Sequence, residues 1–208
     1  MDRAELVRAV SSVRASSARP VLVAIDGRSG SGKSWLAAEL APLLRAAVVP
    51  GDDFYRVMDD DERRALHAAS GAARYFDWER LRAEALVPLR DDGPAAYHPF
   101  DWSGHRGADP AGTAVPPTAV PPGLSVEVRE IEPRDVVLVE GVYSARAELA
   151  DLVELAVLVE VDRATRLRRL AERAAHDPDW HIRWESAEAY YFSTLRPPET
   201  FDVLVAGH

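Results

Sequence analysis

The chain has 208 residues, 47% hydrophobic and 28% charged, which is the balance of a soluble globular protein with one domain. A net charge of −9 argues against a general nucleic-acid binder, and the lack of cysteine excludes disulfides, thiolate catalysis and cysteine-ligated zinc. The first residues are charged and the apolar runs are short, so we expect no signal peptide, no membrane partner and a cytoplasmic protein.

The first part of the chain predicts a helix, a buried strand and a glycine-rich loop that opens a second helix. The first helix covers residues 4–13, and the apolar strand covers residues 21–26. Residues 27–34, GRSGSGKS, fit the phosphate-loop pattern GxxxxGK[ST] without a mismatch, and residues 34–45 continue as a helix. A chance glycine-rich turn would rarely fall in this strand–loop–helix context.

Residues 27–34, the phosphate loop, carry the groups that a nucleotide phosphate requires. The glycines let backbone N–H groups turn toward the phosphates, and the helix start adds a partial positive charge. Lys33, the only lysine among 25 basic residues, can reach the β- and γ-phosphates, and the Ser34 hydroxyl can ligate Mg²⁺. We therefore predict that ATP and Mg²⁺ are the cofactors. The predicted ATP-binding residues here are Gly27, Arg28, Ser29, Gly30, Ser31, Gly32, Lys33, Ser34 and Trp35.

Carboxylates follow two further predicted strands. Asp52 and Asp53 come after the strand 46–50, and Glu140 ends the strand 135–140. Because parallel sheets bind ligands at the carboxyl ends of their strands, both positions are expected beside the phosphate loop. A kinase needs such groups near the metal and as the base for an acceptor hydroxyl. A turn or a helix cap is the alternative role for Asp52 and Asp53.

The remaining segments complete the pattern of an α/β protein. Helices are predicted over residues 78–90, 165–175 and 186–195, and strands over residues 155–161 and 202–206. The proline-rich residues 108–123 predict an exposed loop. Alternating strands and helices predict a P-loop NTPase-type, doubly wound parallel sheet of about five strands with flanking helices, in a single domain over residues 1–208.

These motifs together resemble the uridine kinase family, which is related to phosphoribulokinase and bacterial pantothenate kinase. Residues 52–56, DDFYR, resemble the family's DSFYR segment, and Phe76 with Asp77 resembles its FD pair. Residues 100–106, FDWSGHR, are similar to YDFxxHxR. Residues 137–143, VLVEGVY, and 162–169, DRATRLRR, are similar to VLFEGI and DxDTRLxRR. The resemblance covers most of the chain in order.

The resemblance implies a role for each matching residue. Asp52 would be the catalytic base, assisted by Lys33 and close to Mg²⁺, which Ser34 and Glu140 would hold. A small helical lid over about residues 163–185 would cover the phosphates with Arg169 and Arg173. The residues expected to line the acceptor pocket are Tyr55, Asp77, Tyr97 (or Phe100 in its place) and His105.

Departures from the family pattern fall in the acceptor pocket and the lid. The family's HPDAFD run is missing after Asp77, Phe100 replaces a tyrosine, and Leu170 stands where a lid arginine is expected. On the predicted helix, Arg166, Arg169 and Arg173 share one stripe, which suits either a phosphate clamp or a solvated face.

The leading interpretation is an ATP-dependent phosphotransferase with an alcohol group as acceptor, a uridine or cytidine kinase. Alternatives are a kinase of another hydroxyl metabolite (pantothenate, a sugar or nicotinamide riboside) and a non-catalytic ATP-binding regulatory module. A GTP-binding switch would need a second lysine for its guanine motif NKxD, and Lys33 is already used. The expected partner is therefore a small-molecule substrate.

Overall fold

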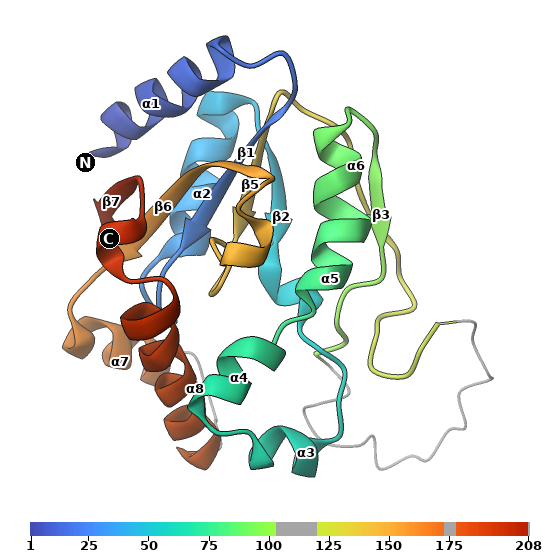
Figure 1. Ribbon diagram of the computed structural model, residues 1–208, viewed down its shortest axis with the longest axis vertical. Coiled ribbons are helices and arrows are strands. Elements are labelled where there is room, and N and C mark those ends of the chain that lie inside the picture. The colour runs from blue at the N-terminus through green and yellow to red at the C-terminus, as the bar shows by residue number, and fades with distance from the viewer. Residues whose placement is uncertain (103–119, 173–177, 208) are drawn as a thin grey trace.

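A five-stranded parallel sheet forms the centre of the molecule (Figure 1). The computed structural model describes residues 1–102, 120–172 and 178–207. The strands are β1 (Val21–Asp26), β2 (Ala47–Pro50), β5 (Val136–Glu140), β6 (Val153–Glu160) and β7 (Val203–Ala206), in the order β2-β5-β1-β6-β7. The predicted α/β fold is confirmed, and every predicted strand is present within two residues of its expected bounds.

Helices cover both faces of this sheet. Their bounds are α1 (Arg3–Ala15), α2 (Lys33–Leu44), α3 (Asp60–Ala65), α4 (Ala68–Arg74), α5 (Trp78–Arg80), α6 (Val87–Arg90), α7 (Arg163–Glu172) and α8 (Pro178–Tyr190). A π-helical stretch over Leu81–Leu86 joins α5 to α6, and another over Tyr191–Leu195 continues α8. Helices α1 and α2 pack on one face, whereas α4, α6 and α8 pack on the other.

The strand β1 shows why the sequence builds two cores. Its six residues are all buried, and successive side chains point to opposite faces. Val23 and Ile25 belong to the core under α1 and α2, whereas Leu22 and Ala24 belong to the core on the other face. A run without polar alternation is what a strand covered on both faces requires, so the central position of β1 follows directly from its composition.

Three features differ from the sequence-based expectation or were absent from it. Helix α8 begins at Pro178, eight residues before the predicted start, because proline suits the first helical turn and Trp180 and Trp184 pack against the core. Helices α3 and α4 were not predicted, since they are short and lack an apolar periodicity. A small antiparallel sheet of β3 (Ala95–Tyr97) and β4 (Arg129–Ile131) was also missed.

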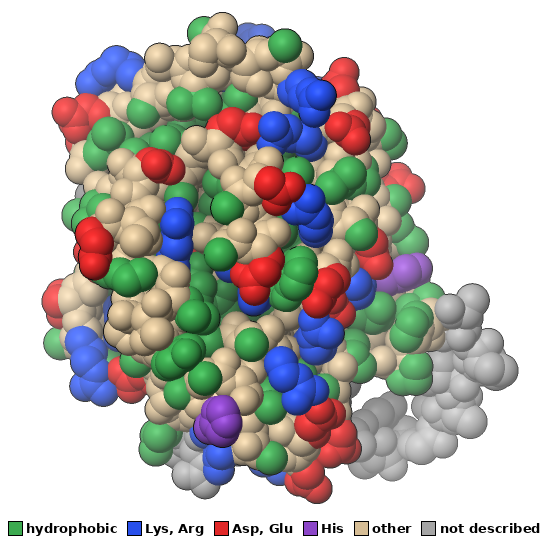
Figure 2. Space-filling model, in the orientation of Figure 1, with side chains coloured by type: hydrophobic (Ala, Val, Ile, Leu, Met, Phe, Trp, Pro, Cys, Tyr) green, Lys and Arg blue, Asp and Glu red, His purple; other side chains and the backbone are tan. Residues whose placement is uncertain are grey.

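The surface carries charges of both signs. On the face drawn in Figure 2, acidic and basic side chains are interspersed and do not gather in one large patch. Within the described ranges, no helix combines the length and the apolar character that crossing a bilayer requires.

Candidate active site

The phosphate loop has the backbone that its glycines predicted. Gly27, Gly30 and Gly32 have φ angles of 147°, 79° and 100°, which side chains rarely allow. A Cβ at Gly27 would lie 2.4 Å from the carbonyl oxygen of Val159, so the close approach of β6 also requires glycine there. Gly32 is the N-cap of α2 and no side chain caps this helix, which leaves its start open to a phosphate group.

A buried carboxylate, Asp26, anchors the base of the phosphate loop. It accepts hydrogen bonds from the backbone N–H of Gly27 at 2.7 Å, of Tyr143 at 2.9 Å and of Ala145 at 3.0 Å, and from the Tyr191 hydroxyl at 2.9 Å. Burial raises the pKa of Asp26 to about 6, although the hydrogen bonds from Ala145, Gly27 and Tyr191 and the charge of Lys33 oppose the shift. The sequence analysis missed this residue. The available signal was an acid that ends an otherwise apolar strand.

Four predicted functional residues meet beside this loop, because β1 and β5 are neighbours in the sheet. The Ser34 hydroxyl donates a hydrogen bond to Glu140 Oε2 at 3.0 Å, and Lys33 Nζ donates to the Arg28 carbonyl at 3.3 Å. Burial and the charge of Asp52 raise the pKa of Glu140, whereas Lys33 and Ser34 lower it. The structure therefore places Lys33, Ser34, Asp52 and Glu140 within electrostatic reach of one another.

This set of donors fits a magnesium ion. Among the described residues, no group of three or more acidic, histidine or cysteine side chains could hold a metal by itself. Magnesium in kinases usually takes one or two carboxylates and completes its octahedron with phosphate oxygens and water. Glu140, Asp52 and the Ser34 hydroxyl would supply the protein's share of such a site.

The neighbouring acids Asp52 and Asp53 lie in different environments within the 3₁₀ turn Gly51–Phe54. Asp53 is buried, accepts a hydrogen bond from the Tyr97 hydroxyl at 2.8 Å and pairs with Arg129 at 3.1 Å. Burial raises the pKa of Asp53, while Tyr97 and Arg129 oppose the shift. Asp52 is exposed, and its negative charge contributes to the raised pKa of Glu140. Asp53 is thus tied into the fold, and Asp52 lies on the side of the candidate metal ligands.

The residues predicted for the acceptor pocket are only partly brought together. Tyr55 and Tyr97 are 4% and 2% exposed, and Tyr55 lies within a cluster of aromatic rings that includes Trp184, so their contact with an acceptor stays a prediction. Asp77 caps α5 and pairs with Arg56 at 3.3 Å, which occupies its carboxylate with structural partners. His105 lies outside the described residues, as do residues 108–119 of the proline-rich loop.

Two arginines of α7 rest on the phosphate loop. Arg166 donates to the Ser29 carbonyl at 3.2 Å, and Arg169 donates to the Gly30 carbonyl at 3.0 Å. Burial lowers the pKa of Arg166, and the charge of Glu188 opposes this shift. Arg173 lies outside the described residues. Carbonyl groups of the phosphate loop are therefore the partners of Arg166 and Arg169.

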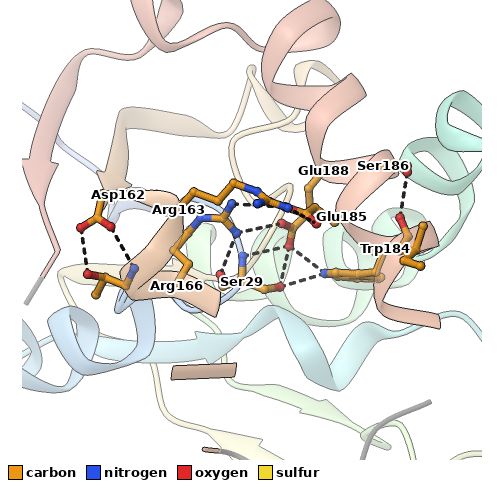
Figure 3. A network of polar contacts seen from close by, with 10 residues as sticks. Ser29, Asp162, Arg163, Arg166, Trp184, Glu185, Ser186 and Glu188 are labelled. Carbon is orange, nitrogen blue, oxygen red and sulfur yellow. Dashed lines mark hydrogen bonds and ion pairs between the residues drawn. The ribbon is translucent and has the colours of Figure 1, made fainter. Parts of the chain in front are cut away.

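Helix α8 contributes Trp184 and Glu188, which the sequence analysis did not select (Figure 3). The Trp184 indole N–H donates to Ser29 Oγ at 2.8 Å and to Glu188 Oε1 at 2.7 Å. Glu188 is only 1% exposed. A fully buried glutamate requires hydrogen-bond partners. The signal available in the sequence was the spacing of Trp184 and Glu188, which places them one helical turn apart on the same face of a helix.

Two cavities are each lined by residues of both α7 and α8, among them Arg166 and Glu185. One of about 380 Å³ is lined in part by Arg28, Arg163 and Phe192, and another of about 420 Å³ is lined in part by Ser29 and Ile182. Both have volumes in the range of small-molecule sites and both reach the phosphate loop.

The chain is similar in sequence to several curated uridine kinases, although no family model matches it. It is 25% identical over 183 residues to the uridine kinase of Latilactobacillus sakei subsp. sakei strain 23K, covering 86% of this chain and 77% of that protein. It is 26% identical over 189 residues to the uridine kinase of Lactobacillus johnsonii, covering 87% and 79%.

Solved structures share the fold across nearly the whole chain. A possible uridine kinase from Bacillus stearothermophilus superposes with a TM-score of 0.67 at 19% identity, covering 97% of this chain and 96% of that one. A putative fructose transport system kinase from Silicibacter sp. TM1040 has a TM-score of 0.67 at 27% identity, covering 99% of both. In its fold, its phosphate loop and its sequence, the chain is thus similar to the uridine kinase-like P-loop kinases.

Proposed function

We propose that this chain transfers the γ-phosphoryl group of ATP to a hydroxyl group of a small metabolite. The observation that carries the proposal is the 3.0 Å hydrogen bond from Ser34 to Glu140, with Lys33 and Asp52 close enough to shift the pKa of Glu140. Bound Mg²⁺ would neutralise charge on the phosphates between these groups. The groups proposed to hold the phosphates and the metal, and an exposed carboxylate, thus lie at one edge of the sheet.

Asp52 and Asp53, the two acids that follow β2, would have different roles. Asp52, exposed beside Glu140, would accept the proton of the acceptor hydroxyl as its oxygen bonds to phosphorus and the bond to ADP breaks. Lys33 would stabilise the charge that builds on the transferring group. Asp53 is bound by Tyr97 and Arg129, which would fix the turn that carries Asp52.

A ribonucleoside, uridine or cytidine, is the first candidate acceptor. Its support is the sequence likeness to uridine kinases over 86% of the chain, together with the position of Asp77 in a motif of that family. A carboxylate can accept hydrogen bonds from both vicinal ribose hydroxyls, although Asp77 would first have to release Arg56.

A second candidate acceptor is a hydroxylated organic acid, and the side chain of Arg63 favours it. Arg63 is 4% exposed, lies 4.3 Å above the Tyr55 ring and donates to the Arg56 carbonyl at 2.7 Å. Its Nε and Nη1 atoms are buried and have no hydrogen-bond partner. Within the described ranges, no carboxylate forms an ion pair with it, and a buried guanidinium without one is costly. A carboxylate on the acceptor would satisfy it.

An acceptor screen tests the proposal and separates the candidates. The assay measures ADP release from MgATP with uridine, cytidine, nicotinamide riboside, pantothenate, fructose and D-glycerate. Fructose and D-glycerate are included because a putative fructose transport system kinase and a D-glycerate 3-kinase from Cryptococcus neoformans share this fold. Stimulation by any of these supports the kinase proposal, and the Arg63→Met variant should lose only turnover of an acid. MgATP binding without stimulation by any acceptor would favour the regulatory module.

A further inference from the structure

The carboxylate of Glu188 lies directly against the apex of the phosphate loop (Figure 3). Its Oε1 accepts hydrogen bonds from the Ser29 backbone N–H at 2.8 Å, the Ser29 hydroxyl at 2.5 Å and the Trp184 indole at 2.7 Å. Its Oε2 lies 3.9 Å from Nη1 of Arg166. One fully buried side chain of α8 therefore holds a residue that is 159 positions away in the sequence.

These contacts determine which way the peptide groups of the loop face. In a trans peptide, the C=O of one residue and the N–H of the next point in opposite directions. Because Glu188 binds the Ser29 N–H, the Arg28 carbonyl faces the other way, where it accepts from Lys33 Nζ at 3.3 Å and from the Ser31 N–H at 3.0 Å. The orientation of the Arg28–Ser29 peptide thus connects Glu188 to Lys33.

The next two peptides are held from α7. Arg166 binds the Ser29 carbonyl and Arg169 binds the Gly30 carbonyl, so three successive peptide groups have their orientation set by side chains of α7 and α8. Gly30 has a φ of 79° and little intrinsic preference for one orientation. The shape of the loop apex must therefore be imposed by its neighbours.

We propose that Glu188 is a positioning residue for nucleotide binding, which orients the Arg28–Ser29 peptide and, through its carbonyl, the ammonium group of Lys33. This inference rests on the proposed kinase function. Trp184 supports Glu188 from one helical turn away. Arg166 offsets the negative charge, so that the buried carboxylate does not simply repel the phosphates.

The decisive measurement is the Kd for MgADP, obtained by isothermal titration calorimetry on the wild type and on Glu188→Gln. A glutamine keeps the shape but removes the charge and presents an amide to the loop, so the Kd should rise about tenfold, the value of one charge-assisted hydrogen bond. The KM for ATP should rise in parallel, and kcat at saturating ATP should change less, because the residue acts on binding.

Glu185→Gln is the matched control. Glu185 lies on the same helix, pairs closely with Arg163 at 2.9 Å and only distantly with Arg166 at 3.9 Å, and makes no hydrogen bond to the loop among the described contacts. Its Kd for MgADP should stay within about twofold of the wild-type value. An equal rise in the Kd for MgADP in both variants would overturn the proposal, because the loss of any negative charge on α8 would then explain the effect.

Other outcomes of these binding measurements are equally decisive. Unchanged or tighter MgADP binding by Glu188→Gln would overturn the proposal, the latter by showing that the carboxylate competes with phosphate. If Glu188→Gln does not fold, Trp184→Phe takes its place, since it removes the supporting indole N–H and keeps the ring. It should raise the Kd about threefold, and no change would overturn the proposal. A wild-type protein that fails to bind MgADP would instead contradict the kinase function.

Discussion

The hydroxyl of Ser34 lies 3.0 Å from Oε2 of Glu140, although the two residues are 106 positions apart in the sequence. The contact joins the first turn of α2 to the carboxyl end of β5. It brings together a hydroxyl and a carboxylate that suit magnesium, before any nucleotide contributes its oxygens. The same side of the sheet also holds Lys33 and Asp52, so the predictions below begin here.

Substitution of Glu140 should act mainly through the metal. Glu140→Gln keeps a hydrogen-bond acceptor for Ser34 but weakens metal ligation, so half-maximal ATP turnover should require about tenfold more Mg²⁺. Magnesium titrations at saturating ATP measure this, and Glu130→Gln, at an exposed position of β4, is the control. A loss of rate that added magnesium does not relieve would argue against ligation by Glu140.

Removal of the Lys33 ammonium should nearly abolish turnover and leave the fold intact. Lys33→Ala should lower kcat/KM at least a hundredfold, comparable to the loss of one preorganised donor worth about 3–4 kcal/mol. Lys33→Arg should also be impaired, because a planar guanidinium does not fit the space of a compact ammonium beside the Arg28 carbonyl. Circular dichroism checks the fold, and a folded alanine variant with a normal rate would refute the kinase proposal.

Substitution of Asp52 should change the catalytic rate, whereas substitution of Asp53 should change the stability of the fold. Asp52→Asn should lower kcat at least a hundredfold while MgADP still binds, because it removes the proton acceptor. Asp53→Asn should lower the free energy of unfolding by about 1–3 kcal/mol, because it disturbs a buried carboxylate bound by Tyr97. Rates and urea denaturation on both variants test this. A kcat collapse confined to a stable Asp53→Asn would reverse the assignment.

The pH dependence of stability should reveal the buried Asp26. Its pKa is about 6 in the folded protein, against the ordinary 3.8 of an aspartate, so between these pH values the folded state binds a proton that the unfolded state has released. The contribution of Asp26 to the free energy of unfolding is therefore fully present below about pH 4. It falls by about 3 kcal/mol as the pH rises through 6.

Asp26→Asn does not titrate and isolates this effect. The difference in unfolding free energy between the wild type and the variant should decrease from pH 4 to pH 7 and then stay level, as measured by urea denaturation across that range. A difference that is constant with pH would show that Asp26 does not titrate in this interval.

The ribonucleoside candidate predicts discrimination between ribose and deoxyribose. If Asp77 accepts hydrogen bonds from both ribose hydroxyls, uridine should exceed 2′-deoxyuridine in kcat/KM at least tenfold. Asp77→Ala should abolish this preference. Because Asp77 also pairs with Arg56, Glu79→Ala, which removes the other acidic partner of that arginine, is the control. Turnover with an organic acid and none with nucleosides would reject the ribonucleoside.

Local patterns predicted the sheet and the phosphate loop because both depend on neighbouring residues. The buried runs such as residues 21–26 define strands, and glycines at fixed spacing define the loop. The same reasoning placed Glu140 correctly beside Ser34, since parallel strands deliver their carboxyl ends to one edge.

The missed features depend on contacts between distant segments. Glu188 reaches Ser29 across 159 positions, and Asp26 collects N–H groups from residues more than 100 positions away. No local periodicity encodes such partners. The short polar helix α3 was missed for a different reason, because its cap at Asp59 is clear in the structure but the six residues have no apolar stripe.

The anchoring of Asp26 has a consequence for how the loop moves. A single carboxylate joins the end of β1, the residues after β5 and the Tyr191 hydroxyl after α8, so these segments form one cooperative unit. The amide hydrogens of Gly27, Tyr143 and Ala145 should then exchange with deuterium only at the rate of global unfolding. The loop can then adjust to an arriving nucleotide only at its apex, Ser29 and Gly30, where side chains of α7 and α8 rather than the sheet hold the backbone.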